Sequence, residues 1–236
     1  MGVAAVEQPP CLGKCVVPGE PIASLPETGT VRVGGGVQQA GRSLIAVKAG
    51  VVQQGPGDSL WVCNRQKRYI PNLNDAVVGI IAHRHSENYT VDIGGPGPAF
   101  LPVLAFEGVA RRNRPNLQVG DVVFCRVEEA ARDLDPVLTC MDTAGKAAGF
   151  GPLKGGTLFQ VSTSHARTLA SGPPFLAALG RSLKFELAVG ANGRVWVDAP
   201  GPANLALVAR LARQAEELDA AGAVAAVKEA LASGLR

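Results

Sequence analysis

Five short apolar or alternating runs between positions 75 and 141 constrain the fold more than any other feature of this chain. They cover residues 75–82, 88–94, 99–106, 121–128 and 136–141. In the second run Tyr89, Val91 and Ile93 fall on one face and the polar residues between them on the other. This is the two-residue period of a β-strand. Five strands with a longer link after the third match a small OB-type barrel, which we predict over residues 71–148.

The residues before this run also have the pattern of short strands. Val31, Val33 and the apolar residues of 44–52 are separated by glycines, and Gly55-Pro56-Gly57 interrupts the pattern before residues 59–70. Glycine (29 residues) and proline (17 residues) are abundant, and aromatic residues make up only 5%. That composition favours turns and short strands over a long helical bundle. We predict a small β-domain over residues 16–70, preceded by a mobile tail over residues 1–15.

Residues 149–236 change from strand to helix periodicity. The pattern predicts strands at 157–162, 184–189 and 194–198 and short helices at 164–170 and 174–179, which Gly172-Pro173 separates. Helices follow from Pro202 and over about 223–232, with Leu205, Val208, Leu211 and Leu218 on one face of the first. The order β-α-α-β-β-α is that of an α+β module. The chain is therefore predicted to be a multi-domain β and α+β protein.

The cysteines and the termini limit where such a chain resides. There are five cysteines, Cys11, Cys15, Cys63, Cys125 and Cys140. An odd number without a visible secretory signal favours reduced thiols in an intracellular protein. Cys11 and Cys15 have half the spacing pattern of a zinc site, but no second pair follows, so ordinary thiols are favoured. No apolar run reaches the length of about 18 residues that a membrane helix needs.

No recognisable catalytic motif is present. His83 and His85 are spaced so that both can face one side of a strand, but a third metal ligand is not evident nearby. The sequence lacks a phosphate-binding loop and a nucleophile motif. Asp133 and Asp135 fall in a stretch that indicates a turn between strands rather than a metal-dependent nuclease site. We therefore expect no catalytic residue, no cofactor and no metal.

Basic residues are clustered although the net charge is only +3. Arg111, Arg112 and Arg114 lie within four positions, and Lys67 and Arg68 adjoin Arg65. Clustering matters more than total charge for binding a polyanion, because neighbouring cations act on the same stretch of phosphates.

Three stretches resemble one known family. They are residues 66–71 (QKRYIP), residues 106–115 (FEGVARRNRP) with Val119-Gly120-Asp121 after them, and residues 190–197 (GANGRVWV). In this order and at this spacing, over about residues 16–236, they resemble the exosome cap subunits known as ribosomal RNA-processing protein 40 or exosome component 3.

The resemblance implies an N-terminal domain, an S1-type barrel and a KH-type module. It also implies a non-catalytic subunit that binds RNA and guides RNA 3′ ends toward a separate 3′–5′ exoribonuclease. The implied partners are RNA, RNase PH-like ring subunits and other cap subunits in a hetero-oligomer, without a membrane. The implied location is the nucleus and nucleolus, and also the cytoplasm. The alternatives are the sister cap subunit of the ribosomal RNA-processing protein 4 type, a stand-alone S1/KH RNA-binding protein or nuclease, and a scaffold that does not touch RNA.

The candidate RNA-binding residues are Lys67, Arg68, Arg84, Arg111, Arg112 and Arg114. Guanidinium groups can hold phosphates in a bidentate way and stack on bases. The same arginines can instead make docking contacts between domains or subunits. The sequence alone leaves this choice open.

Two motifs depart from ordinary S1 and KH patterns. Thr90 stands where S1 barrels commonly expose an aromatic residue, and Tyr89 shares the face of the core residues, which favours a buried Tyr89. Residues 190–193 match the GXXG clamp of KH domains, but strands flank them and a hairpin turn is predicted. The predicted junction of the two short helices carries Ser171-Gly172-Pro173-Pro174, which is not a clamp. Gly190, Asn192, Gly193 and Trp196 are therefore expected to have a structural role, such as packing against the barrel.

Overall fold

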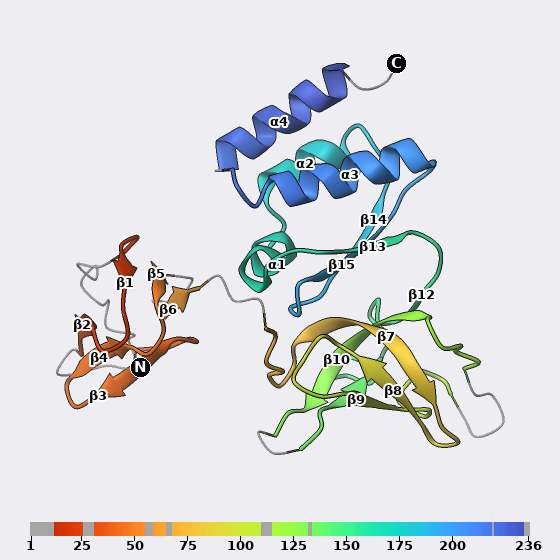
Figure 1. The fold of residues 1–236 in the computed structure, drawn as a ribbon, viewed down its shortest axis with the longest axis horizontal. Coiled ribbons are helices and arrows are strands. Elements are labelled where there is room, and N and C mark those ends of the chain that lie inside the picture. Colours follow the sequence, from red (N-terminus) through yellow and green to blue (C-terminus); the bar gives the residue numbers. More distant parts are fainter. Residues whose placement is uncertain are drawn as a thin grey trace. The chain divides into compact units, whose positions relative to one another are not determined.

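The computed structural model describes residues 12–25, 31–54, 59–64, 68–109, 115–131, 134–218 and 220–233. The chain divides into two units, Met1–Arg65 and Gln66–Arg236 (Figure 1). The predictions for Cys11, Gly55-Pro56-Gly57, Lys67, the three clustered arginines and Asp133 lie outside the described residues. No helix in the described ranges is long and apolar enough to cross a membrane.

The N-terminal unit is a small β-domain, as predicted. Its strands are β1 (Cys15–Val16), β2 (Pro21–Ser24), β3 (Val37–Ala40), β4 (Ser43–Ala46), β5 (Gly50–Gln54) and β6 (Leu60–Cys63). They form two antiparallel three-stranded sheets, in the orders β1-β5-β6 and β2-β4-β3. The core contains Val16, Ile22, Leu44, Val52 and Leu60. The Gly13 N–H donates to the Val52 carbonyl, so residues 12–15 already belong to this unit.

The second unit begins with the predicted OB-type barrel. Its strands are β7 (Ala76–Arg84), β8 (Asn88–Asp92), β9 (Ala99–Pro102), β10 (Val122–Glu129), β11 (Val137–Thr139) and β12 (Gly151–Leu153). The order is β11-β9-β8-β7-β10-β12, and pairing of β11 with β10 closes the barrel. The third strand is shorter than predicted, because the chain turns at Val103 after Pro102. Strand β12 lies beyond residue 148 and still pairs with β10.

The barrel core follows the alternation that the sequence predicts. Tyr89, Val91 and Ile93 are at most 1% exposed, which confirms that Tyr89 is a core residue. Tyr69 was expected to continue the strands of the N-terminal domain, and this was wrong. β6 ends at Cys63, and Tyr69 packs into the barrel core instead.

Two thiols meet in the barrel core. Cys125 of β10 and Cys140 after β11 are buried and reduced, with their Sγ atoms 3.4 Å apart. Burial raises the pKa of the Cys125 thiol, and the neighbouring Cys140 thiol adds to the rise. The Cys125 thiol therefore behaves as an apolar packing group at neutral pH.

The remainder of the second unit is the predicted α+β module. Its elements are β13 (Thr157–Gln160), α1 (Thr163–Ala170), α2 (Pro174–Gly180), β14 (Glu186–Val189), β15 (Arg194–Asp198), α3 (Pro202–Gln214) and α4 (Ala220–Ser233). The sheet is antiparallel with the order β13-β15-β14. Ser162 caps α1 by accepting from the His165 N–H, and Pro174 begins α2 at a position where a missing N–H costs little.

The sheet of this module has two covered faces. One face packs against the helices, with Val195, Val197, Val208 and Leu211 buried in one cluster. The other face packs against the barrel, as the arrangement in Figure 1 shows. The prediction that Leu218 shares one face of the helix that begins at Pro202 was wrong. The helix ends at Gln214, so its periodicity does not reach Leu218, which is 39% exposed.

Candidate nucleic-acid interface

Of the six candidate RNA-binding residues, Arg68 and Arg84 are described, and both are exposed. Arg84 is the last residue of β7, next to the turn of the β7–β8 hairpin. A register shift between Ile81 and His83 interrupts the strand pairing there. The Arg84 Nη1 group donates to Asn116 Oδ1 at 2.7 Å. One of its five N–H donors is thereby used, and the guanidinium is held toward residues 115–116.

Tyr89 makes a second contact with the same segment. Its hydroxyl donates to the Pro115 carbonyl at 2.5 Å, while its ring lies in the barrel core. In place of an exposed stacking platform, the barrel therefore has a buried tyrosine that fixes the chain directly after Arg114. Sequence periodicity predicted the burial of the ring but gave no signal for this hydroxyl contact.

A pocket of about 300 Å³ lies where these contacts meet. Its lining residues are Arg84, His85, Ser86, Tyr89, Val103 and Pro115. The His85 Nε2 atom lies 3.2 Å from Thr90 Oγ1, so this imidazole packs against the neighbouring strand. The described residues contain no group of three or more His, Cys, Asp or Glu side chains that could hold a metal ion. The pocket offers a guanidinium and an imidazole, which suit the phosphate of a nucleic-acid backbone.

A second pocket adjoins the same segment. It has a volume of about 610 Å³ and is lined by Pro115, Asn116, Leu117, Asp121, Pro152, Leu153, Lys154 and Gly155. Pro115 borders both pockets, which places open surface on each side of the chain that follows the clustered arginines.

The segment that carries Arg68 is held in place by Tyr69, the next residue. The Tyr69 hydroxyl donates to Asp75 Oδ2 at 2.9 Å, and the Asn72 N–H donates to the same oxygen. Burial raises the pKa of Tyr69 well above its usual value, and the Asp75 carboxylate raises it further. Tyr69 therefore stays protonated and holds the start of the barrel in place.

The residues 190–193 form a hairpin turn between β14 and β15, as predicted. Gly193 has a φ of +79°, whereas Asn192 is not among the described residues with positive φ. The role of Asn192 is hydrogen bonding. Its Nδ2 donates to the carbonyls of Val78 and Ile93, each at 2.8 Å, and its Oδ1 accepts from the Val78 N–H at 3.3 Å.

The turn of residues 190–193 covers the part of β7 that does not pair with β8. β8 pairs with β7 only from Ile80 onward. Before that point, the Ala191 N–H donates to the Ala76 carbonyl, and Asn192 pairs with Val78. The GXXG-like motif therefore satisfies backbone groups of Ala76 and Val78 in β7.

An ion pair strengthens this contact between the barrel and the α+β module, which we call the junction. Arg194 Nη2 contacts Asp92 Oδ2 at 2.6 Å, and its Nη1 donates to the Asp92 carbonyl. Partial burial opposes ionisation of the Asp92 carboxyl, but the hydrogen bonds from Arg194 and the Gly94 N–H outweigh it and lower the pKa of Asp92. The sequence analysis did not single out this pair, which joins residues 102 positions apart.

Apolar packing completes the junction. Val78 of the barrel, Ala188 and Trp196 form one buried cluster, with Val122 and Phe124 against it. The Trp196 Nε1–H donates to the Gly155 carbonyl at 3.0 Å, so the indole is buried with its polar group satisfied. The barrel and the α+β module thus share a hydrophobic contact surrounded by hydrogen bonds.

Comparisons with known proteins match this architecture. The family model for the S1 domain of exosome complex component RRP40 matches residues 69–151, and a KH domain model matches residues 156–203. The exosome complex component rrp40 of Schizosaccharomyces pombe is 42% identical over 208 residues, which are 84% of this chain and 87% of that protein. RRP40 of Drosophila melanogaster is 39% identical over 188 residues, 78% of this chain and 81% of that protein.

A solved structure described as an exosome complex RNA-binding protein has the same fold. Its TM-score is 0.56 at 22% sequence identity, over 69% of this chain and 96% of that one. The fold and the domain matches define a protein with an S1 barrel joined to a KH module. The chain belongs to the RRP40 family of exosome complex components, which confirms the resemblance carried by the three sequence stretches.

Proposed function

We propose that this chain is a non-catalytic, RNA-binding cap subunit of the RNA exosome. In this role it helps to guide RNA 3′ ends toward a separate 3′–5′ exoribonuclease for processing or degradation. The observation that carries the RNA-binding role is the meeting of Arg84, the pocket beside it and Pro115–Asn116 at the end of the β7–β8 hairpin. Membership of the RRP40 family supports the exosome role.

The chemistry of this surface suits a sequence-tolerant RNA contact. A guanidinium binds phosphate oxygens with parallel N–H donors and does not read the base. Arg114 directly precedes Pro115 in the sequence, and Arg111 and Arg112 precede it by four and three positions. The anchored Pro115 keeps this basic run within a few residues of the Arg84 pocket. A machine that accepts many RNAs needs contacts of this kind.

The proposed partners are RNase PH-like ring subunits and the other cap subunits, in a hetero-oligomer. Affinity purification of the tagged chain at low and high salt, read by mass spectrometry, tests this. Recovery of ring and cap subunits supports the proposal, and recovery of the folded chain alone contradicts it. We propose the nucleus, the nucleolus and the cytoplasm as its locations, and imaging of the tagged chain tests them.

The RNA role is tested by crosslinking labelled single-stranded RNA to the assembled complex. Replacing Arg84 and the three clustered arginines by glutamine is expected to reduce crosslinking while the complex stays assembled. A scaffold without RNA contact predicts the opposite result, namely weaker assembly with unchanged crosslinking per complex. The non-catalytic role is tested with the purified chain, which is expected to leave RNA intact in the presence of divalent cations.

A further inference from the structure

The chain between β11 and β13 lies beside the barrel segments on both sides of the basic run of residues 111–114. The described chain leads into this run at Val109 and continues after it at Pro115. Between β11 and β13 the sequence contains two basic residues, Lys146 and Lys154, and both are exposed. Lys146 stands in a loop that contacts the segment before the run, and Lys154 borders a pocket that the segment after the run also lines.

Hydrogen bonds within one short loop fix the position of Lys146. Asp142 Oδ1 accepts from the Ala144 and Lys146 N–H groups, at 2.8 and 2.9 Å. The Asp142 N–H in turn donates to the Lys146 carbonyl at 2.7 Å. The backbone at position 146 is thereby held at both its N–H and its carbonyl, as in other turns closed by an aspartate side chain. No described residue pairs with the Lys146 ammonium group, so the loop presents a free cation from a fixed backbone.

This loop is tied to the segment that leads into the basic run. The Ala147 N–H donates to Glu107 Oε2 at 2.6 Å, and Glu107 stands four positions before the first arginine of the run. Phe106 and Cys140 also form a parallel bridge, so the two segments leave the barrel side by side. Lys146 is therefore one residue away from a direct contact with the segment that carries the arginines.

Lys154 lies beside the segment that follows the run. It lines the pocket of about 610 Å³ together with Pro115, which directly follows Arg114 in the sequence. Asp121 is the carboxylate among the lining residues, and its Oδ2 accepts from the Gln118 N–H at 2.8 Å. No described residue pairs with the Lys154 ammonium group. This ammonium group is therefore available to a phosphate that approaches Pro115.

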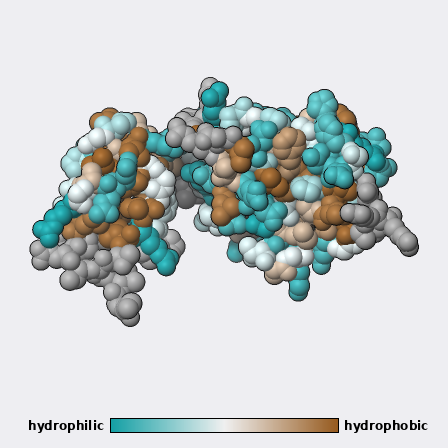
Figure 2. Space-filling model, turned by 90° about the horizontal axis from the view of Figure 1, so that it is seen from below, coloured by the Kyte–Doolittle hydropathy of each residue, from teal (hydrophilic) through white to brown (hydrophobic). Residues whose placement is uncertain are grey.

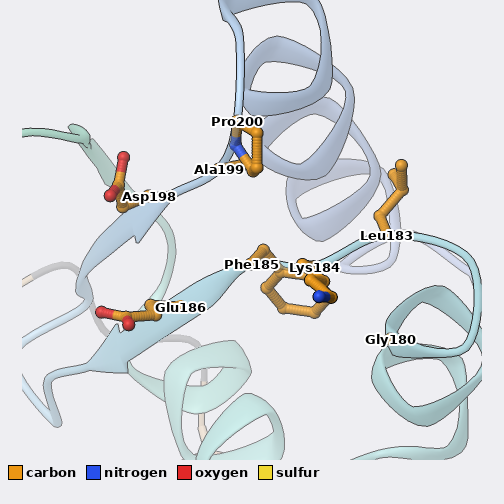
Figure 3. A pocket seen from close by; sticks show the side chains of 8 residues that line it. All are labelled: Gly180, Leu183, Lys184, Phe185, Glu186, Asp198, Ala199 and Pro200. Carbon is orange, nitrogen blue, oxygen red and sulfur yellow. The ribbon is translucent and has the colours of Figure 1, made fainter.

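Charge distinguishes the surroundings of these two lysines from those of another exposed lysine. Figure 2 shows hydrophilic and hydrophobic side chains mixed over the visible face of the second unit, so hydropathy alone does not mark a nucleic-acid surface there. A groove of about 590 Å³ in the KH module (Figure 3) contains Lys184, but Glu186 and Asp198 line it as well. Those two carboxylates would repel a phosphate. Residues 108–117, in contrast, contain three arginines and no acidic side chain.

We infer that Lys146 and Lys154 are further phosphate contacts of the RNA, one on each side of the basic run. This inference rests on the proposed RNA-binding role and extends its surface to the chain between β11 and β13. An ammonium group on a flexible stem binds phosphate as a point charge and does not read the base. The two lysines therefore lengthen the track of cations along a single strand without making it selective for sequence.

The test is a salt titration of RNA binding by the assembled complex, read by fluorescence anisotropy of labelled oligouridylate. Lys146→Gln and Lys154→Gln are each expected to reduce the magnitude of the slope of log affinity against log salt concentration by about 0.7, and the double variant by about 1.4. Lys184→Gln removes the same charge from the KH groove and should leave the slope unchanged. A double variant with the same slope as Lys184→Gln would overturn the inference.

Two substitutions of Asp142 test whether the fixed loop matters. Asp142→Asn removes a negative charge but keeps an oxygen that can accept from the Ala144 and Lys146 N–H groups. Asp142→Ala removes the same charge and releases the loop, so it is expected to bind RNA roughly twofold or more weakly than Asp142→Asn. Equal affinities of the two variants would contradict the contact assigned to Lys146.

The same titration separates this inference from the proposed RNA contact. Glutamine at all three arginines of the run tests the proposed contact itself. If that variant reduces the slope and the lysine variants do not, the inference alone is wrong. If neither the arginine variant nor the lysine variants change the slope, both the inference and the proposed RNA contact are wrong.

Discussion

The side chain of Asn192 pairs with the backbone of Val78 as a neighbouring strand would. Its Nδ2 donates to the Val78 carbonyl at 2.8 Å, and its Oδ1 accepts from the Val78 N–H at 3.3 Å. The two residues are 114 positions apart, and Asn192 is 4% exposed. One side chain of the KH module thus replaces the pairing that β8 does not provide to the first half of β7.

Replacing Asn192 by alanine is expected to lower the free energy of unfolding by about 2–4 kcal/mol, because buried backbone groups of Val78 and Ile93 lose their partners. Chemical denaturation measures this loss. Hydrogen exchange of the Val78 amide should also become faster. Asn204→Ala is the matched control, since Asn204 makes one exposed contact with the Pro200 carbonyl. A loss no larger than that of the control would show that the junction does not depend on this amide.

Close approach to β7 also requires glycine at position 190. A Cβ atom there would lie 2.6 Å from the Val78 backbone nitrogen and would also meet Asn192 Oδ1. Gly190→Ala is therefore expected to destabilise the chain by roughly 2 kcal/mol or more, since backbone must move to relieve the clash. Gly35→Ala, where a Cβ meets nothing within 4 Å, should change stability by no more than about 0.5 kcal/mol. Thermal and chemical unfolding compare the two variants, and equal effects contradict the packing argument.

The sequence could predict the elements but not the junction between them. Alternation in residues 88–94 and helical spacing after Pro202 come from local burial, so strands, helices and the core position of Tyr89 follow from the pattern. The contact of Asn192 with Val78 joins residues that no local period connects. Of the Asn-Gly pair in this turn, Gly193 has positive φ and Asn192 does not. A polar residue in a turn has the same local signature whether its amide faces water or a barrel strand.

The boundary between the N-terminal domain and the barrel could not be predicted from the local pattern either. Tyr69 lies in a run that continues the N-terminal strands in sequence, yet its ring fills the barrel. Burial of an aromatic residue says that a core is near, but not which core. The same limit applies to Arg84. Its charge marked it as a candidate, whereas its contact with Asn116 depends on the path of the link after β9.

The ion pair between Asp92 and Arg194 predicts a dependence on pH. The pKa of Asp92 is lowered in the folded chain, so its contribution is complete above the ordinary value of 3.8 and is lost as the pH falls through the lower folded value. Asp92→Asn should cost up to about 1 kcal/mol at pH 7, a modest amount because the carboxylate is half exposed. The difference between wild type and variant should shrink toward zero well below pH 3.8. Denaturation at several pH values measures it, with the exposed Glu128→Gln as the matched charge-removal control. A constant difference across the series would contradict this role of the pair.

The hydroxyl of Tyr89 is expected to position the basic run rather than to support the core. Tyr89→Phe keeps the buried ring and removes the donor to the Pro115 carbonyl, which should cost about 1 kcal/mol of stability. RNA crosslinking to the assembled complex should fall, because the chain next to Arg114 loses an anchor. Arg84→Lys tests the neighbouring contact, since a lysine keeps the charge but lacks the fork that reaches Asn116. Full crosslinking by Tyr89→Phe would show that the anchor has no part in RNA binding.

The clustered arginines predict a defined salt dependence of RNA binding. Each phosphate contact with a single strand contributes about −0.7 to the slope of log affinity against log salt concentration. If Arg111, Arg112 and Arg114 each contact one phosphate, replacing all three by glutamine should reduce the magnitude of the slope by about 2. The measurement is fluorescence anisotropy with labelled oligouridylate and the assembled complex between low and physiological salt. Replacing Arg32, Arg42 and Lys48 of the N-terminal unit by glutamine removes the same charge and should leave the slope nearly unchanged. An equal reduction in both triple variants would mean that the arginines act only through net charge, and an unchanged slope in the first would favour docking over RNA contact.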